Sequence, residues 1–344
     1  MRKVVFGAIG VGLLALGLLV GYTIPRGEGT VGTGGHANVE GHEWKAANRH
    51  VAYVLPNDGP YYDLKWAGVS SELRRLGYEP QKYTAAGYKN IKAQTDILEN
   101  LIQRRVAGII LHSVSDTAVV PFIERAYDAG IPVIAENVEI KSDKIAGRVM
   151  LADYQNGWEL AMGLTEAIHG KGKIAALIGP PGLETTDEMW RGAKAYFARF
   201  PQIEIVREEY LQANTPESLE RAQAILSAHR DLAGIYTWYV QNAIGAAEAV
   251  RQAGIGPNKI PIVAKDINPQ GEQLLQEGYI TYLLVGEPVA MGRASAILLN
   301  DLLVGKATGR DIVMRNFLVD RRSLGTMDRS GFEVPPGGRE NAQP

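Results

Sequence analysis

The chain has 344 residues, of which 46% are hydrophobic and 22% are charged, and its formal net charge is −2. The length and composition fit a globular protein of two ordinary domains and exclude a disordered chain. The net charge is close to zero, so it gives no sign of the excess positive charge that binding to DNA or RNA requires. Because the sequence has no cysteine, it excludes disulfides, thiolate metal sites, a cysteine nucleophile and a lipid-modified N-terminal cysteine.

The N-terminal segment has the pattern of an export signal. Arg2 and Lys3 precede an uncharged apolar run from Val4 to Ile24. As a helix this run is about 31 Å long, enough to cross a bilayer core. We expect residues 1–24 to be a signal peptide or a membrane anchor that tethers the chain, and both alternatives stay open. The Gly-rich residues 25–48 are expected to be a linker, and the rest to be extracytoplasmic, in the periplasm or at the outer face of the cytoplasmic membrane.

From Val51 the chain alternates short apolar runs with longer amphipathic stretches, which predicts a parallel sheet with helices on both faces. The expected strands of the first half are Val51–Leu55, Tyr78–Tyr83, Ala107–Leu111 and Pro132–Ala135. The expected helices of this half are Tyr61–Leu76, Ile91–Arg104 and Ala118–Ala129. A further helix, Tyr154–His169, follows them.

The same order of elements recurs in the second half. The expected strands are Ile174–Ile178, Ile203–Tyr210, Ala233–Thr237 and Pro261–Ala264. The expected helices are Glu188–Arg199, Pro216–His229 and Ala243–Ala253. Two short motifs also recur, at the nearly equal offsets of 126 and 129 residues: Ala107–Ile110 with Ala233–Tyr236, and Ile131–Ile134 with Ile260–Val263. The matched order and offsets indicate a duplicated α/β unit.

Polar and aromatic residues gather where the predicted strands end. In open α/β sheets, ligands bind beyond the carboxyl ends of the strands. In the first half these ends are Asn57–Tyr62, His112–Asp116 and Glu136–Asn137. In the second half they are Gly179–Gly182, Thr237–Tyr239 and Lys265–Asn268. If the two halves face each other, these loops line one cleft.

The order and spacing of these motifs resemble the type I periplasmic solute-binding proteins, of the ribose-, galactose- and autoinducer-2-binding kind. The resemblance extends from about Val51 to about Val319. It is carried by Asn57 with Tyr61-Tyr62, Gly108–Ser113, Gly130–Ile134, Asp153–Gly157, Ile262–Asp266 and Met291-Gly292. Within this family the periplasmic sensors of trimethylamine N-oxide look especially similar, at Ala86–Tyr88, Gln94, Lys144–Val149 and Gly179–Pro181.

The resemblance implies a fold of two Rossmann-like α/β lobes with parallel sheets, joined by a three-segment hinge. The N-terminal lobe would comprise residues 49–151 and 287–316, and the C-terminal lobe residues 152–286 and 317–326. The hinge crossings would lie near Ala152, Gly286 and Phe317. Residues 327–344 are expected to be a disordered tail.

The function that the resemblance implies is capture of a small polar ligand, sugar-like or amine-bearing, and its delivery to the membrane subunits of an ABC importer. The alternative is a periplasmic sensor that signals to a membrane histidine kinase, and fold alone does not separate the two.

Hydrolase, P-loop, zincin and dinucleotide motifs are missing from the expected strand–helix contexts. We therefore expect no enzyme, no cofactor and no nucleic-acid partner. His36, Glu40, His42 and Glu43 could bind a metal, but a solvated polar stretch is favoured, so no metal is expected.

The expected ligand contacts follow from the strand ends and from the resemblance. Tyr61 and Tyr62 align with stacking aromatics, and Asp266 is expected to accept hydrogen bonds from the ligand. Asp153 is a ligand contact or a helix N-cap, with equal weight. Sugar receptors commonly carry Asp-Arg where this chain has Glu136-Asn137, and their second-lobe Arg is replaced by Met189 or shifted to Arg191. The other expected contacts are Asn57, His112, Tyr154, Trp190, Trp238 and Tyr239.

Overall fold

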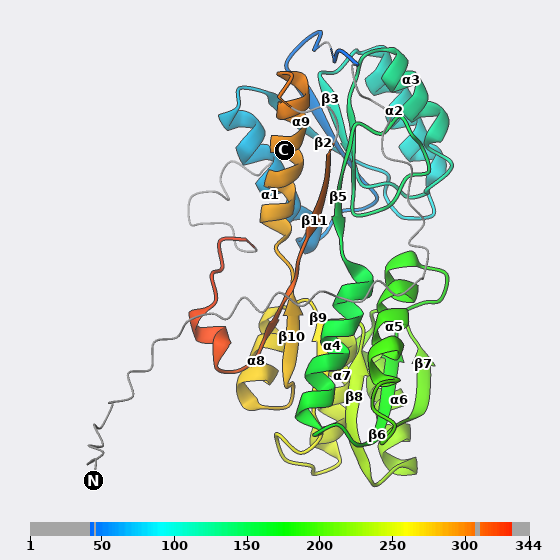
Figure 1. Cartoon of the computed structure of the whole chain (residues 1–344), viewed down its shortest axis with the longest axis vertical. Coiled ribbons are helices and arrows are strands. Elements are labelled where there is room, and N and C mark those ends of the chain that lie inside the picture. Colours follow the sequence, from blue (N-terminus) through cyan, green and yellow to red (C-terminus); the bar gives the residue numbers. More distant parts are fainter. Residues whose placement is uncertain (1–41, 45, 307–309, 332–344) are drawn as a thin grey trace, which may run out of the picture. The chain divides into compact units, whose positions relative to one another are not determined.

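The computed structural model describes residues 42–44, 46–306 and 310–331, which belong to one unit, Gly35–Pro344 (Figure 1). The predicted export segment, most of the predicted linker and residues 332–344 lie outside the described residues. Among the helices that are described, none has the length and apolar character that a bilayer crossing requires.

The N-terminal lobe is built on a six-stranded sheet in the order β11-β5-β4-β3-β1-β2, and all its neighbouring strands are parallel. Its strands are β1 His50–Leu55, β2 Glu79–Thr84, β3 Gly108–Leu111, β4 Val133–Glu136, β5 Gly147–Leu151 and β11 Arg310–Met314. Its helices are α1 Pro60–Arg75, α2 Ile91–Gln103, α3 Val120–Asp128 and α9 Pro288–Leu303.

The C-terminal lobe is built on a second six-stranded sheet in the order β12-β10-β9-β8-β6-β7, in which only β12 is antiparallel to its neighbour. Its strands are β6 Gly172–Ile178, β7 Ile203–Tyr210, β8 Leu232–Thr237, β9 Ile262–Lys265, β10 Tyr282–Val285 and β12 Phe317–Val319. Its helices are α4 Asp153–Ala167, α5 Glu184–Phe197, α6 Thr215–Ala228, α7 Val240–Gln252, α8 Pro269–Glu277 and the 3-10 turn η1 Ser323–Thr326.

The two sheets confirm the predicted duplication. Strands β2-β1-β3-β4-β5 of the first sheet have the same order as β7-β6-β8-β9-β10 of the second. The two pairs of sequence echoes fall on corresponding strands, β3 with β8 and β4 with β9. The chain passes between the sheets three times, after β5, after β10 and between β11 and β12.

Continuous apolar runs form the central strands because both faces of each sheet are covered by helices. On β1, Val51, Tyr53 and Leu55 pack in the core beneath α1 and α9, whereas Ala52 and Val54 pack in the core beneath α2 and α3. Successive side chains of a strand point to opposite faces, so each sheet has two apolar cores. The central strands are therefore unbroken hydrophobic stretches and do not alternate between polar and apolar residues.

Glycines allow two pairs of helices to pack closely, one pair in each lobe. A Cβ atom at Gly157 of α4 would lie 1.7 Å from the carbonyl oxygen of Met189 on α5, and one at Gly192 of α5 would lie 2.0 Å from that of Tyr154. Helices α1 and α9 make the corresponding contact in the N-terminal lobe through Gly68 and Gly292.

We expect Gly157→Ala to lower the free energy of unfolding by about 1–3 kcal/mol, because the added methyl group meets backbone atoms and the helices must move apart. Urea denaturation measures this change. Gly256→Ala is the matched control, since a Cβ atom there has no neighbour within 4 Å, and its stability should stay within about 0.5 kcal/mol of the parent. Equal stability of the two variants would contradict the close packing of α4 and α5.

The structure corrects two predicted chain ends. Part of the predicted linker packs on the N-terminal lobe, where the ring of His42 stacks on Tyr127 at 4.0 Å and Trp44 meets the same ring edge-on. The predicted disordered tail is ordered up to Gly331. Its Arg329 pairs with Glu272 of α8 at 2.7 Å, and the carbonyl oxygen of Gly331 accepts a hydrogen bond from the backbone N–H of Val289 at the start of α9. Side-chain pairing and a helix N-terminus thus hold this segment.

Candidate functional site

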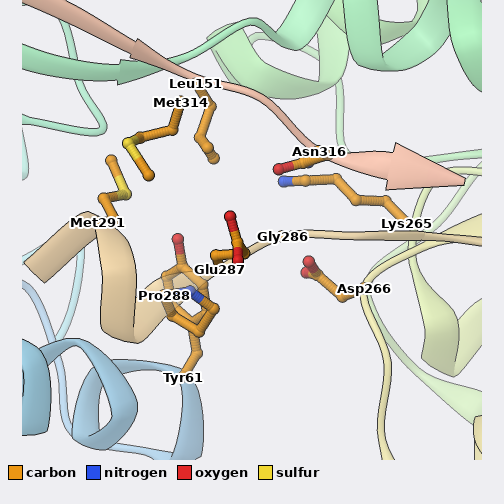
Figure 2. Close-up of a pocket in the computed structure, with 10 residues that line it drawn as sticks. All are labelled: Tyr61, Leu151, Lys265, Asp266, Gly286, Glu287, Pro288, Met291, Met314 and Asn316. Carbon is orange, nitrogen blue, oxygen red and sulfur yellow. The ribbon is translucent and has the colours of Figure 1, made fainter. Parts of the chain in front are cut away.

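A cavity lies where the carboxyl ends of strands from both lobes meet the segments that cross between the sheets (Figure 2). It is lined by Tyr61, Leu151, Lys265, Asp266, Gly286, Glu287, Pro288, Met291, Met314 and Asn316. These residues come from the start of α1, the ends of β5, β9, β10 and β11, and the start of α9. The cavity therefore combines two predicted ligand contacts, Tyr61 and Asp266, with polar groups that the sequence did not single out.

The C-terminal lobe contributes a charged group of side chains at the end of β9. Asp266 has a left-handed backbone, with φ of 69°, and its carboxylate accepts a hydrogen bond from the hydroxyl of Tyr239. The ammonium of Lys265 lies 4.0 Å from the carboxylate of Asp153. Burial raises the pKa of Asp266 and Asp153 raises it further, although Lys265 and Tyr239 oppose the rise. The group thus holds two carboxylates against one ammonium.

Asn316 lies on the third crossing segment and is only 7% exposed. Neither polar atom of its side-chain amide has a hydrogen-bond partner among the described residues. Its side chain lies against Gly286 of the second crossing, where a Cβ atom would come within 2.9 Å of Asn316 Oδ1. A buried amide without a partner costs free energy. Both atoms are therefore available to a molecule in the cavity.

Tyr61 lines the cavity on the side of the N-terminal lobe, and further aromatic side chains lie beside it. The rings of Tyr61 and Tyr62 meet edge to face at 5.6 Å. The hydroxyl of Tyr61 donates to Asn137 Oδ1 at 3.4 Å, and that of Tyr62 lies 2.7 Å from the hydroxyl of Tyr88. Burial raises the pKa of both Tyr61 and Tyr62, so these side chains act as neutral phenols. They provide apolar faces and hydroxyl groups together.

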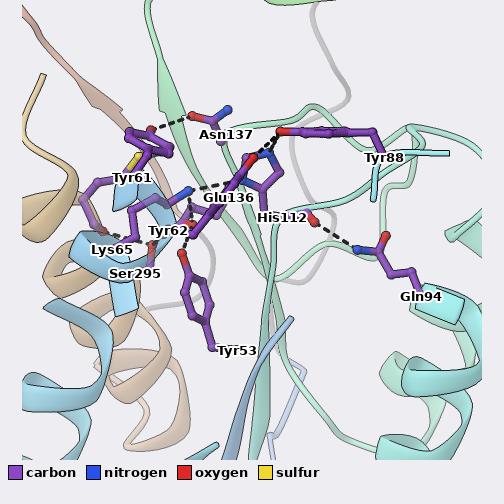
Figure 3. Close-up of polar contacts among 11 residues, drawn as sticks. Tyr53, Tyr61, Tyr62, Lys65, Tyr88, Gln94, His112, Glu136, Asn137 and Ser295 are labelled. Atoms are coloured by element: carbon purple, nitrogen blue, oxygen red, sulfur yellow. Dashed lines mark hydrogen bonds and ion pairs between the residues drawn. The ribbon is translucent and has the colours of Figure 1, made fainter. Parts of the chain in front are cut away.

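Beneath these rings lies a fully buried polar cluster (Figure 3). Lys65 of α1 pairs with Glu136 at the end of β4, with 2.5 Å between the charged atoms. Glu136 also accepts hydrogen bonds from Tyr53 at 2.7 Å and from Ser295 of α9 at 2.9 Å. His112 Nδ1 lies 3.2 Å from the ammonium of Lys65. The cluster joins α1, α9 and the ends of three strands.

Two predicted ligand contacts belong to this cluster and not to the cavity surface. Both carboxylate oxygens of Glu136 are used by protein donors, and the side chain is fully buried. His112 is 1% exposed, and Tyr88 lies next to its outer nitrogen, Nε2. The prediction of direct ligand contact by Glu136 and His112 is therefore wrong, because each strand end turns these side chains inward toward α1.

Met189 and Trp190 were also predicted as ligand contacts, and the structure places both in the core of the C-terminal lobe. Met189 is 1% exposed and Trp190 is 4% exposed, and the indole N–H of Trp190 donates to Glu208 at 3.1 Å. They lie on the face of α5 that packs against the sheet and α4. Arg191, the alternative position for the missing arginine, is exposed and paired with Glu188.

Three further predicted contacts are Asp153, Tyr154 and Asn57, and none of them is among the residues that line the cavity. Asp153 is the first residue of α4 and accepts from Asn156, while Ala152 occupies the N-cap, so the N-cap alternative is wrong. Tyr154 stacks beneath the guanidinium of Arg191, 4.4 Å from its ring centre. Asn57 is exposed in the loop after β1.

Trp238 lies against the loop after β6. A Cβ atom at Gly179 would come within 2.6 Å of the indole ring, whose buried N–H has no partner among the described residues. The ring of Tyr239 lies beside it at 5.4 Å. Their contact with a ligand stays a prediction.

Five polar residues of the site were not predicted as ligand contacts: Lys65, Tyr88, Lys265, Glu287 and Asn316. Of these, Lys265 and Tyr88 lie in segments that were named from the sequence. Lys65 carried the clearest signal, because a lysine between Leu64 and Trp66 on an amphipathic helix interrupts the apolar face. Asn316 carried none, since nothing local marks an asparagine between two short strands. In the described ranges, no group of three His, Asp or Glu side chains could hold a metal ion; His36 and Glu40 lie outside them.

Comparison with known proteins gives consistent results. A family model described as a periplasmic binding protein domain matches residues 51–307. The ribose import binding protein of Bacillus subtilis is 23% identical over 257 residues, which cover 74% of this chain and 81% of that protein. The D-allose-binding periplasmic protein of Escherichia coli is 22% identical over 265 residues, which cover 74% and 85%.

Solved structures show the same fold. A periplasmic solute-binding protein of an ABC transporter from Actinobacillus succinogenes, with bound D-allose, superposes with a TM-score of 0.74 at 22% identity. The match covers 81% of this chain and all of that one. A solute-binding protein from Bacillus halodurans with bound myo-inositol matches with a TM-score of 0.73 at 19% identity, covering 82% and 98%. At these identities the likeness concerns the fold.

Proposed function

Because the chain belongs to the periplasmic binding protein family, we propose that it captures a small polyhydroxylated ligand and delivers it to the membrane subunits of an ABC importer. The protein acts outside the cytoplasm, as this family does, and it is a binding protein rather than an enzyme. The relatives described above are a ribose import binding protein and a D-allose-binding periplasmic protein. They give no support to the alternative of a sensor for a membrane kinase.

One observation carries the proposal: a single cavity is lined by Tyr61 from the N-terminal lobe, by Asp266 from the C-terminal lobe and by Asn316 from a crossing segment. A ligand that contacts all three joins both lobes and the segments between them. Contacts made only when the lobes are together favour the closed form. The three crossings, near Ala152, Gly286 and Asn316, act as the hinge.

The side chains of the cavity define the chemistry of the ligand. Asp266 and Glu287 line the cavity and provide acceptors for hydroxyl or ammonium donors, and Asp153 lies 4.0 Å from Lys265, the one ammonium at the cavity among the described residues. The ring of Tyr61 suits the C–H face of a sugar. Acidic sugars are disfavoured, because their carboxylate would meet an excess of negative charge. A neutral sugar, a polyol or an amino sugar fits this composition.

A thermal-shift screen of the full chain tests this proposal, with D-ribose, D-allose, D-apiose, xylitol, D-glucosamine, D-glucuronate and trimethylamine N-oxide. A ligand at 100 times its dissociation constant stabilises the fold by about 2.7 kcal/mol. We expect a shift from a neutral or amino sugar or from xylitol, and none from D-glucuronate. Cells that lack the gene should then lose uptake of the labelled ligand. A shift from trimethylamine N-oxide alone, or unchanged uptake, would count against the importer.

Replacing Asn316 by the similarly sized leucine separates binding from stability. We expect Asn316→Leu to weaken affinity by about tenfold, because a ligand loses its hydrogen bonds to the amide. The free protein should become more stable by about 1 kcal/mol, because a buried amide without partners is removed. Calorimetric titration with the best compound of the screen and urea denaturation measure the two effects. A loss of stability with unchanged affinity would show that Asn316 is structural.

A further inference from the structure

A chain of polar contacts runs from the buried cluster to the hydroxyl groups of Tyr88 and Tyr62, next to Tyr61, which lines the cavity (Figure 3). It begins at the Lys65 ammonium and continues through the imidazole of His112, whose Nε2 lies 3.2 Å from the hydroxyl of Tyr88. It ends at the hydroxyl of Tyr62, 2.7 Å from that of Tyr88. We call the side chains of Lys65, His112, Tyr88 and Tyr62 the relay. Each has a fixed number of hydrogen-bond donors and acceptors, and these numbers determine the direction of each hydrogen bond in the relay.

The first step is that Lys65 is charged. Glu136 accepts a hydrogen bond from the hydroxyl of Tyr53 at the oxygen that faces Lys65, whereas its other oxygen shares the single proton of the Ser295 hydroxyl with the carbonyl oxygen of Met291. Two donors that meet at one oxygen, Tyr53 and Lys65, suit an ionised carboxylate. The ammonium of Lys65 lies 2.5 Å from the same carboxylate, and both side chains are fully buried. Burial lowers the pKa of Lys65, and the carboxylate of Glu136 opposes that fall by favouring the charged ammonium.

The second step is the tautomer of His112. An ammonium has three donors and no acceptor, so Nδ1 of His112 must accept from Lys65 and carries no proton. A neutral imidazole then has its proton on Nε2, and that N–H donates to the hydroxyl oxygen of Tyr88. Burial first, and the charge of Lys65 second, lower the pKa of His112 well below its ordinary value. The imidazole thus stays neutral.

The third step counts the protons of the two tyrosines. Tyr88 and Tyr62 have two O–H groups, and one of them is used in the hydrogen bond between the two oxygens. With a proton on His112 Nε2, the other O–H has no partner in the relay. With the opposite tautomer, Tyr88 would donate to His112 and Tyr62 to Tyr88, and no O–H would remain.

We infer that Lys65 and His112 are positioning residues that leave one O–H of the Tyr62–Tyr88 pair as a donor to the ligand, which must present an acceptor oxygen there. This inference rests on the proposed function. Tyr88 is 46% exposed. Burial raises the pKa of both hydroxyls; Tyr239 of the other lobe adds to the rise at Tyr62, and Lys265 of that lobe opposes it at Tyr88. The donor complements the acceptor Asp266, so the cleft distinguishes two ends of a polyol: one receives a hydrogen bond and the other donates.

The tautomer can be tested without any ligand. The full chain, labelled with ¹⁵N at histidine, is examined by long-range ¹H–¹⁵N correlation from pH 6 to 8, and His112→Asn assigns the signals by their loss. We expect a protonated Nε2 and an unprotonated Nδ1 for His112 over this range. A protonated Nδ1, or an imidazolium, would overturn the inference. In the variant Lys65→Met/Glu136→Met the tautomers should mix, and an unchanged spectrum would show that Lys65 does not set the tautomer.

A double-mutant cycle with the binding compound of the screen tests the donor. Removing both hydroxyl groups with Tyr62→Phe/Tyr88→Phe should weaken affinity by about five- to tenfold, the effect of one hydrogen bond. Either single change leaves the other hydroxyl free to donate. Lys65→Met/Glu136→Met should also weaken affinity, although these residues touch no ligand. The variant with all four substitutions should be no weaker than Tyr62→Phe/Tyr88→Phe, because both pairs of changes act on the same donor. Additive losses would overturn the coupling. If no compound of the screen binds the parent chain, the proposed function fails, while the spectrum still decides the tautomer.

Discussion

Asp266→Ala is expected to abolish measurable ligand binding while the protein stays folded. The carboxylate lies in the cavity at the end of β9, where it can accept from two ligand hydroxyls. A hydrogen bond to a charged acceptor contributes about 1.5–3 kcal/mol, so the loss of two weakens affinity by about a hundredfold or more. Stability should not fall, because burial raises the pKa of Asp266, which means that its charged form is unfavourable in the folded state.

The raised pKa of Asp266 also determines how ligand affinity should depend on pH. Since the folded pKa of Asp266 is raised above the ordinary value of 3.8, its contribution to stability is greatest at low pH and is lost as pH rises through the folded pKa. Ligand hydroxyls need the carboxylate form. Affinity should therefore fall as pH is lowered, beginning at a higher pH than an ordinary aspartate would require.

Calorimetric titration of parent and variant with the best compound of the screen measures both effects. The matched control is Asp231→Ala, which removes a surface partner of Lys173 and should leave affinity and its pH profile unchanged. Retention of affinity within threefold in Asp266→Ala would remove this carboxylate from the binding site. A pH profile that is the same in Asp266→Ala and in the parent would assign the titration to another group.

Lys65→Met is expected to lower the free energy of unfolding by about 3–5 kcal/mol, the largest stability change among the side chains of the site. The substitution leaves the buried carboxylate of Glu136 without its cation, and an unpaired buried charge is strongly destabilising. Lys65→Met/Glu136→Met should regain most of the loss, because replacing a whole buried ion pair by apolar side chains is often close to neutral. Urea denaturation of the three proteins gives the comparison.

The exposed pair Lys92–Asp96 of α2 provides the control. Lys92→Met should change stability by less than about 0.5 kcal/mol, because exposed ion pairs contribute little. A cost below 1 kcal/mol for Lys65→Met would mean that Lys65 is not charged in the folded protein. That result would also undermine the tautomer inferred for His112.

The sequence by itself predicted most of the secondary structure and the edge of each sheet at which the cavity lies. Apolar runs and amphipathic stretches are local patterns, so the predicted strands and helices up to Ala264 agree with the structure, apart from shifts at their ends. The strand β5 was missed because Arg148 interrupts its short apolar run. The loops at the strand ends were found because the carboxyl edge of a parallel sheet follows from chain direction alone. Tyr61 and Asp266, which line the cavity, were singled out in this way.

Tertiary structure decided which polar side chains face the cavity and which face the core. Glu136 follows a strand just as Asp266 does, but its partners Tyr53 and Ser295 lie 83 and 159 residues away, and they turn it inward. Met189 and Trp190 point into the core because α5 packs that face against α4 and the sheet. The direction of a side chain at a strand end or on a helix depends on which distant elements pack against it. Local sequence does not contain that information.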